Sequence, residues 1–120
     1  MAAGALFVGW GPAVRGREQR ALQVFDEALQ YYTRLQQQGD IDSFEPVLLE
    51  PHGGDLGGFI LVRGDQEKLS RVRMSDEFQR LNARAGLIVE NLGVITAFVG
   101  EGLQHAMGDF HAEIAEVSQH

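Results

Sequence analysis

The feature that most restricts the fold is a change of hydrophobic period in the first half of the chain. From about residue 16 to 38, apolar residues recur at steps of four and three: Ala21, Phe25, Ala28, Tyr32 and Leu35. This spacing predicts an amphipathic helix of about 22 residues, roughly 33 Å long. The flanking segments 5–10 and 43–50 are short, rich in apolar and aromatic residues and bounded or interrupted by glycine and proline. They are typical of strands, so the chain begins strand, helix, strand.

The middle of the chain continues this order with a hairpin and a second helix. Pro46 cannot donate a ladder hydrogen bond, so segment 43–50 is predicted to be an edge or bulged strand. A glycine-rich turn over residues 51–58 joins it to a strand over residues 59–63. Asp65 is placed to cap the helix that follows, and Ser75 resembles a new helix start, which predicts a break there.

The last third adds a strand and a helix. Residues 94–99 alternate as a fourth strand. A final amphipathic helix is predicted over about residues 102–117, because its apolar residues again recur at steps of four and three. They are Leu103, Met107, Phe110, Ile114 and Val117.

This order predicts an α+β protein with the ferredoxin-like βαββαβ fold and an additional C-terminal helix. We expect one domain over residues 1–120, with a core over about 5–100 and an antiparallel four-stranded sheet carrying both helices on one face. The strands are apolar on both faces, so we also expect the second face to be buried.

Composition excludes several classes of function. Seventeen acidic against ten basic side chains give a formal charge of −7, which argues against nucleic acid and anionic membranes as partners. The absence of cysteine excludes disulfides, thiolate metal sites and cysteine nucleophiles. No apolar run is long enough to span a membrane, and residues 1–10 lack the basic start of a signal peptide. We therefore expect a cytoplasmic protein.

The chain resembles the dimeric α+β barrel superfamily over most of residues 5–100. The resemblance rests on Phe59-Ile-Leu-Val-Arg63, Asp65, Ser75-Asp-Glu-Phe78 and Gly93-Val-Ile-Thr-Ala-Phe-Val99. In that superfamily two ferredoxin-like sheets pack face to face, which implies a homodimer. Members include cofactor-independent monooxygenases, haem-degrading enzymes, muconolactone isomerases, stress-responsive proteins and proteins of unknown activity, so the resemblance does not fix a function.

The haem-degrading members use an Asn, a Trp and a His in their pocket. Trp10, Asn82, Asn91 and the histidines of this chain cannot be matched to that pattern, so those roles are not transferred. We predict no cofactor.

Histidines and glycines provide weaker candidates for a site. His105 and Asp109 lie four residues apart, a spacing that suits metal ligands, but no third ligand is evident nearby. We interpret His52, His105 and His111 as solvated or capping residues, with a catalytic role left open, and we predict no metal. The loop Gly53–Gly58 lacks the lysine of a phosphate-binding loop and is better explained as a hairpin turn.

Four residues on otherwise apolar strands form the predicted ligand site: Arg63, Trp10, Thr96 and Phe98. If they share the sheet face that points away from the helices, they line a mostly apolar pocket with Arg63 as its charged contact. In the alternative, Arg63 is a surface charge at a strand end and Thr96 is a packed strand residue.

Three functions follow as hypotheses. The favoured one is a small homodimeric protein that binds an apolar or aromatic molecule in a pocket on the sheet face. The second is a cofactor-independent monooxygenase or isomerase of the same fold; the strands show no clear general base, so whether the chain is an enzyme stays open. The third is an interaction protein that uses the C-terminal helix, which docks either on its own sheet or on the other subunit.

Overall fold

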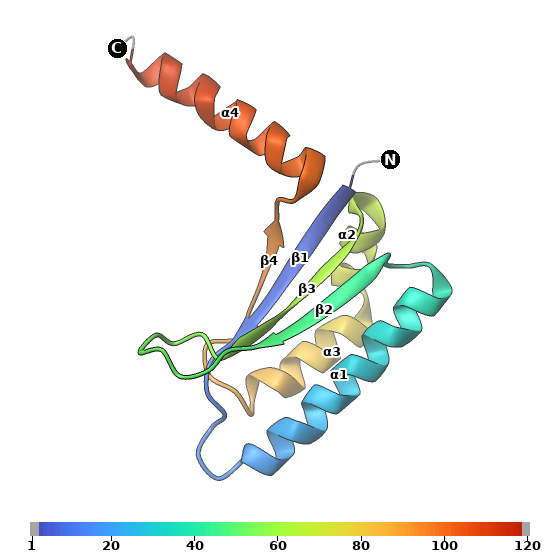
Figure 1. The fold of residues 1–120 in the computed structure, drawn as a ribbon. Coiled ribbons are helices and arrows are strands. Elements are labelled where there is room, and N and C mark those ends of the chain that lie inside the picture. The colour runs from blue at the N-terminus through green and yellow to red at the C-terminus, as the bar shows by residue number, and fades with distance from the viewer. Residues whose placement is uncertain (1–2, 119–120) are drawn as a thin grey trace.

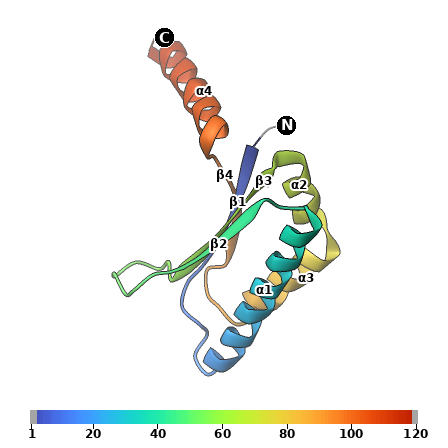
Figure 2. The ribbon, with the colours of Figure 1, turned by 45° about the vertical axis from the view of Figure 1, so that its right-hand side comes forward.

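The computed structural model describes residues 3–118, in which one antiparallel sheet carries a layer of helices on a single face (Figure 1). The strand order is β2-β3-β1-β4. The elements are β1 (Ala3–Trp10), α1 (Glu18–Gln38), β2 (Ser43–Leu48), β3 (Gly58–Asp65), α2 (Gln66–Met74), α3 (Asp76–Gly86), β4 (Gly93–Ala97) and α4 (Gly100–Ser118). Figure 2 shows α1, α2 and α3 together on one side of the sheet. The predicted α+β ferredoxin-like fold with an additional C-terminal helix is confirmed.

The register of the strands decides which side chains enter the core. Leu6 of β1 lies opposite Val62 of β3, and Val8 lies opposite Ile60. All four are at most 5% exposed, because α1, α2 and α3 cover this face of the sheet. Successive strand residues point to opposite faces, so Phe7 and the residues aligned with it lie on the other side.

The second helical region breaks where the sequence predicts. The Asp65 carboxylate accepts a hydrogen bond from the Lys68 amide at 3.3 Å, which caps α2. The Ser75 hydroxyl accepts one from the Phe78 amide at 3.3 Å, which caps α3. Each cap satisfies an amide that has no partner within its helix.

Several element boundaries differ from the sequence prediction. The first helix begins at Glu18 and not near residue 16, because Gly16 has a left-handed φ of +89°. The second strand ends at Leu48 and not at residue 50. The fourth strand ends at Ala97, so Phe98 lies in the short connection to α4, whose first residue Gly100 also has a positive φ.

The C-terminal helix α4 extends away from the sheet (Figures 1 and 2). None of its residues is buried, and its apolar side chains are 46–72% exposed. Only the start of the helix approaches the domain, where a Cβ on Gly102 would lie 3.4 Å from the Ala3 carbonyl oxygen. The alternative in which this helix docks on its own sheet is therefore wrong.

Between residues 3 and 118, no helix is both long enough and apolar enough to cross a membrane.

Candidate ligand-binding site

A cavity of about 190 Å³ lies between the helix-facing side of the sheet and helices α1 and α3. We call it the Trp10 cavity. Its lining includes Trp10 of β1, Phe25, Ala28 and Tyr32 of α1, and Asn82 and Ala85 of α3. Alanines within the apolar stripes of both helices leave room where larger side chains would meet. The cavity is therefore built from the same apolar pattern that predicts the helices.

Trp10 enters the cavity beside Gly58, where the absence of a side chain leaves room for the indole. Trp10 pairs with Gly58 across the β1–β3 ladder, and a Cβ on Gly58 would lie 2.9 Å from Cζ2 of the indole. The indole packs edge-on against Phe25, with ring centroids 5.6 Å apart. A Cβ on the next residue, Gly11, would lie 2.9 Å from the carbonyl oxygens of both Asp55 and Glu90, so a side chain there would push the β1–α1 loop away.

Polar groups are few in the Trp10 cavity, and no charged side chain lines it. Asn82 Nδ2 donates a hydrogen bond to the Phe78 carbonyl oxygen at 2.9 Å, which fixes the amide on α3. Burial raises the pKa of the Tyr32 phenol well above its usual value, so this group stays protonated at neutral pH. The cavity can bind an apolar molecule and offer it indole, phenol and amide groups, but no carboxylate or imidazole lines it to act as a general base.

The four residues of the predicted ligand site do not share one wall. Thr96 pairs with Leu6 and so lies on the helix-facing side, as Trp10 does. Arg63 pairs with Ala5, one residue along β1, and therefore lies on the opposite face. The predicted pocket away from the helices is wrong for Trp10 and Thr96, because the sequence does not fix the register between strands.

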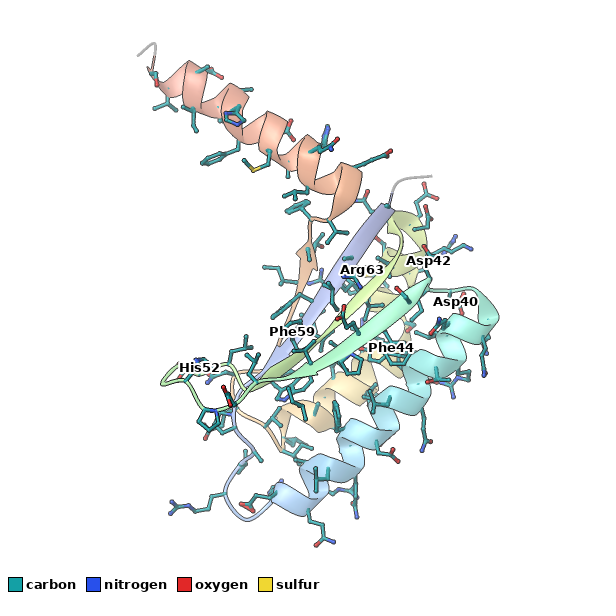
Figure 3. All side chains as sticks on the ribbon, in the orientation of Figure 1. Asp40, Asp42, Phe44, His52, Phe59 and Arg63 are labelled. Carbon is teal, nitrogen blue, oxygen red and sulfur yellow. The ribbon has the colours of Figure 1, made fainter. Side chains whose placement is uncertain are left out.

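Arg63 lies on the sheet face that the helices leave bare, where Figure 3 shows it on the same strand as Phe59. We call this surface the open face and define it by Phe7, Phe59, Leu61, Arg63 and Ile95. The rings of Phe7 and Phe59 stack with centroids 5.0 Å apart, and Ile95 is 62% exposed. The Arg63 side chain is 42% exposed and pairs with Glu45 of β2 at 3.3 Å. Within one chain it is a strand-end surface charge, the alternative stated above.

A second pocket, of about 140 Å³, lies where the start of β1, helix α2, the end of β4 and the start of α4 meet. We call it the Arg73 pocket; its polar lining residues are Gln66, Ser70, Arg73, Thr96 and His105, and Phe98 is among its apolar ones. Thr96 and Phe98 of the predicted site are thus brought together, but beside Arg73 and not Arg63. Arg73 has no distinguishing mark in the sequence, where it is one of several arginines along a polar helix.

His52 stabilises a loop, and His105 lies on an exposed helix surface. In the β2–β3 loop, the Gly54 amide donates to Nδ1 of His52 at 3.2 Å, and Nε2 of the same ring lies 2.8 Å from the Leu56 carbonyl oxygen. His105 and Asp109 approach to 3.5 Å on the exposed surface of α4. Among residues 3–118, no three His, Cys, Asp or Glu side chains come together as a metal site.

No family model and no curated protein matches the chain. Three solved structures with a similar fold are informative. A dimeric ferredoxin-like protein of unknown function from Jannaschia sp. CCS1 is 16% identical, with a TM-score of 0.64 over 82% of this chain and 100% of that one. A dimeric ferredoxin-like protein of unknown function from Bacteroides fragilis is 10% identical, with a TM-score of 0.59 over 79% of this chain and 94% of that one. SnoaB, a cofactor-independent oxygenase from Streptomyces nogalater, is 17% identical, with a TM-score of 0.53 over 82% of this chain and 97% of that one.

These likenesses have low sequence identity, so they show the fold and not an activity. The similar structures agree with the ferredoxin-like fold that the order of strands and helices in the sequence predicts. The chain has the ferredoxin-like fold.

Proposed function

We propose that this protein is a homodimer that binds a small, uncharged apolar or aromatic molecule in the Trp10 cavity. The observation that carries the proposal is a cavity of about 190 Å³ between sheet and helices whose lining has no charged side chain. Ligand sites of small proteins are commonly apolar clefts with a few placed polar groups, which here are Asn82, Tyr32 and the indole of Trp10. The expected cytoplasmic location remains part of this proposal.

The size of the cavity limits the ligand. An apolar cavity of about 150 Å³ in another protein admits benzene, so the Trp10 cavity suits a molecule of one or two rings. Trp10 and Phe25 present aromatic surfaces, which favour a ring that can stack or meet them edge-on. An ionised ligand is disfavoured, because no opposite charge would compensate its loss of water.

Binding without catalysis is supported by the chemistry of the lining. A proton-abstracting enzyme needs a base within hydrogen-bond reach of the reacting atom. The side chain in the cavity that could lose a proton in water is the Tyr32 phenol, and burial raises its pKa. The alternative, an oxygenase, is supported by the similarity of the fold to that of SnoaB.

The homodimer is supported by the open face. Phe7, Phe59 and Ile95 lie there with no helix above them, and a sheet face of this kind is normally covered. Two solved structures with a similar fold are described as dimeric. In the proposed dimer, the open faces of two copies pack against one another, which removes both apolar surfaces from water.

The ligand proposal is tested with the single tryptophan of the chain, Trp10, as the reporter. Nitrobenzene and nitronaphthalene are titrated against the protein, and quenching of Trp10 fluorescence and the shift in melting temperature are recorded. Ala85→Leu places three more carbon atoms in the cavity and should weaken binding by about tenfold or more, equivalent to roughly 1.4 kcal/mol. Ala83→Leu is the matched control, because Ala83 is exposed on the same helix and does not line the cavity.

Either of two results contradicts the ligand proposal. One is that neither probe quenches Trp10 or raises the melting temperature of the native protein. The other is that Ala85→Leu and Ala83→Leu bind the probes equally while both variants remain folded by circular dichroism.

The dimer proposal is tested by sedimentation equilibrium, where the native protein should show about twice 13.2 kDa. Ile95→Arg places a charge on the open face beside Phe7 and should give the monomer mass. Met74→Arg is the control, because Met74 is similarly exposed, at 74%, but lies on α2 on the other side of the sheet. A folded native monomer, or an Ile95→Arg variant that dimerises as well as Met74→Arg, contradicts the packing of the open faces.

A further inference from the structure

We propose that the Arg73 pocket is a second binding site, which takes a small carboxylic acid in its ionised form with a short-chain or single-ring tail. This site is separate from the Trp10 cavity, and it differs from it in chemistry because it contains a cation. The proposal does not depend on the function proposed above.

The first observation is the position of the Arg73 guanidinium. Arg73 lies in the last turn of α2 and reaches across to β4, where it donates to the Val94 carbonyl oxygen at 3.0 Å and to the Thr96 hydroxyl at 3.4 Å. Both acceptors are neutral. A guanidinium has five N–H hydrogens, so these two bonds leave three without a bond to the described residues. Arginine is suited to carboxylates because its planar fork can donate two parallel hydrogen bonds.

The second observation is the absence of a counter-charge. Among residues 3–118, the three ion pairs that involve arginine join Arg34, Arg63 and Arg84 to glutamates. Within residues 3–118, no carboxylate lies within 4 Å of Arg73, and no Asp or Glu lines its pocket. A half-buried cation without a protein anion can be paired by an anion from solution.

Other polar groups converge on the same pocket from two helices. Ser70 and Gln66 belong to α2, and His105 belongs to the second turn of α4. The His105 side chain is 83% exposed, which places it at the mouth of the pocket. A hydroxyl, an amide and an imidazole can all donate hydrogen bonds to carboxylate oxygens that Arg73 holds.

The remaining wall is apolar and sets the kind of tail. Leu6, Leu69, Ala97 and Phe98 line the pocket together with the first residues of β1. Its volume of about 140 Å³ is close to the roughly 150 Å³ of a cavity that admits benzene. One cation with an apolar wall fits a single carboxylate on a small hydrocarbon better than phosphate, which would leave most of the wall uncovered.

The pocket exists because β4 is shorter than β1. The ladder between them stops at the pair Ala5–Ala97, so Ala3 and Gly4 have no β4 residue beside them. Helix α4 begins three residues later and closes the gap from outside, with Gly102 close to the Ala3 carbonyl oxygen. The start of α4 is therefore one wall of the site.

The experiment is isothermal titration of the full chain with benzoate and with butyrate at constant ionic strength. Benzamide, which has the shape of benzoate without its charge, and inorganic phosphate are titrated for comparison. We expect benzoate and butyrate to bind with one site per chain, and benzamide and phosphate to bind at least about tenfold more weakly. Tighter binding of phosphate than of both carboxylates overturns the assignment of the ligand class.

Variants locate the site. Arg73→Leu should weaken benzoate binding by about tenfold to a hundredfold, the range for a lost charge-assisted hydrogen bond. Arg71→Leu is the matched control, since Arg71 is exposed on the same helix and does not line the pocket. If Arg73→Leu does not fold, Thr96→Val and Ser70→Ala test the same pocket while they keep the Arg73 side chain. Each of these two variants should weaken benzoate binding severalfold.

Ala85→Leu separates the two sites, because it obstructs the Trp10 cavity and should leave benzoate affinity unchanged. The inference is overturned if benzoate does not bind the native protein, or if Ala85→Leu abolishes benzoate binding. It is also overturned if benzoate binds Arg71→Leu and every folded variant of the Arg73 pocket with equal affinity. Nitrobenzene binding reports on the Trp10 cavity and benzoate binding reports on the Arg73 pocket. Failure of one proposal can therefore be told from failure of the other.

Discussion

The protein should lose stability above about pH 10, and its two tyrosines are the cause. Tyr31 is 6% exposed and Tyr32 is 2% exposed. Burial raises the pKa of both phenols above the usual value, most strongly for Tyr32. In the unfolded chain the phenols are solvated and lose their protons near pH 10. The folded state still binds these protons at that pH, so the free energy of unfolding falls as the pH rises.

The size of this loss follows from the shift at Tyr32. For a phenol whose folded-state pKa is far above the unfolded one, the free energy of unfolding falls by about 1 kcal/mol from pH 10 to pH 11. At higher pH the fall approaches about 1.4 kcal/mol per unit, until the folded-state pKa is reached. Below about pH 9 the contribution is complete and does not change. The chain has no cysteine and a single lysine, which keeps the background from other side chains small.

The measurement is urea unfolding at several values between about pH 8 and about pH 11, with tyrosinate absorbance followed in parallel. Tyr32→Phe should remove the contribution of Tyr32 to the alkaline loss. No hydrogen bond joins the Tyr32 hydroxyl to another described residue, so phenylalanine can keep the ring packing against Phe44, where the centroids are 5.7 Å apart. If native protein and Tyr32→Phe lose stability equally over this range, burial of Tyr32 does not cause the loss.

Three further predictions concern stability and assembly. Ile60→Ala should lower the free energy of unfolding, measured in urea, by about 2–5 kcal/mol, because Ile60 is 2% exposed on a central strand of the sheet. A loss below about 1 kcal/mol would contradict the position of Ile60 in the core. Ser75→Ala should cost about 1 kcal/mol through loss of the α3 cap, whereas Ser118→Ala should cost nothing measurable in the same assay. Deletion of residues 101–120 should weaken the proposed dimer in sedimentation equilibrium, because the apolar stripe of α4 is exposed within its own chain and a second copy would cover it. An unchanged dimer would contradict this role of the stripe.

Local patterns predicted the elements of the fold well. The helix period fixed α1 to within two residues at its start, and the capping residues Asp65 and Ser75 fixed the break between α2 and α3. These signals depend on residues within one helical turn, which is why one sequence is enough to detect them. The end of β4 was placed two residues too late, because Phe98 and Val99 prolong the apolar run and the turn into α4 depends on Gly100.

The candidate sites were predicted less well, because they depend on contacts between distant segments. Alternation shows that Phe59, Leu61 and Arg63 share one face of a strand, but not which face of the neighbouring strand they match. The register of β3 and β4 on β1 depends on which strand faces the helices cover, and the strand sequences do not contain this information. Thr96 and Phe98 line one pocket, since both lie near the end of β4. Their charged neighbour Arg73 comes from a helix, where the sequence gives it no distinguishing mark.

The two outer strands of the sheet have a consequence for solubility. A free strand edge offers unpaired amides and carbonyls to which another chain can add a strand, which is how ordered fibrils grow. On β2 the edge is interrupted by Pro46, which has no amide hydrogen, and carries the charged Glu45. On β4 the edge is only five residues long and is followed by a helix. Copies of this protein should therefore resist lateral strand addition, so a bare open face would not by itself lead to extension of the sheet into fibrils.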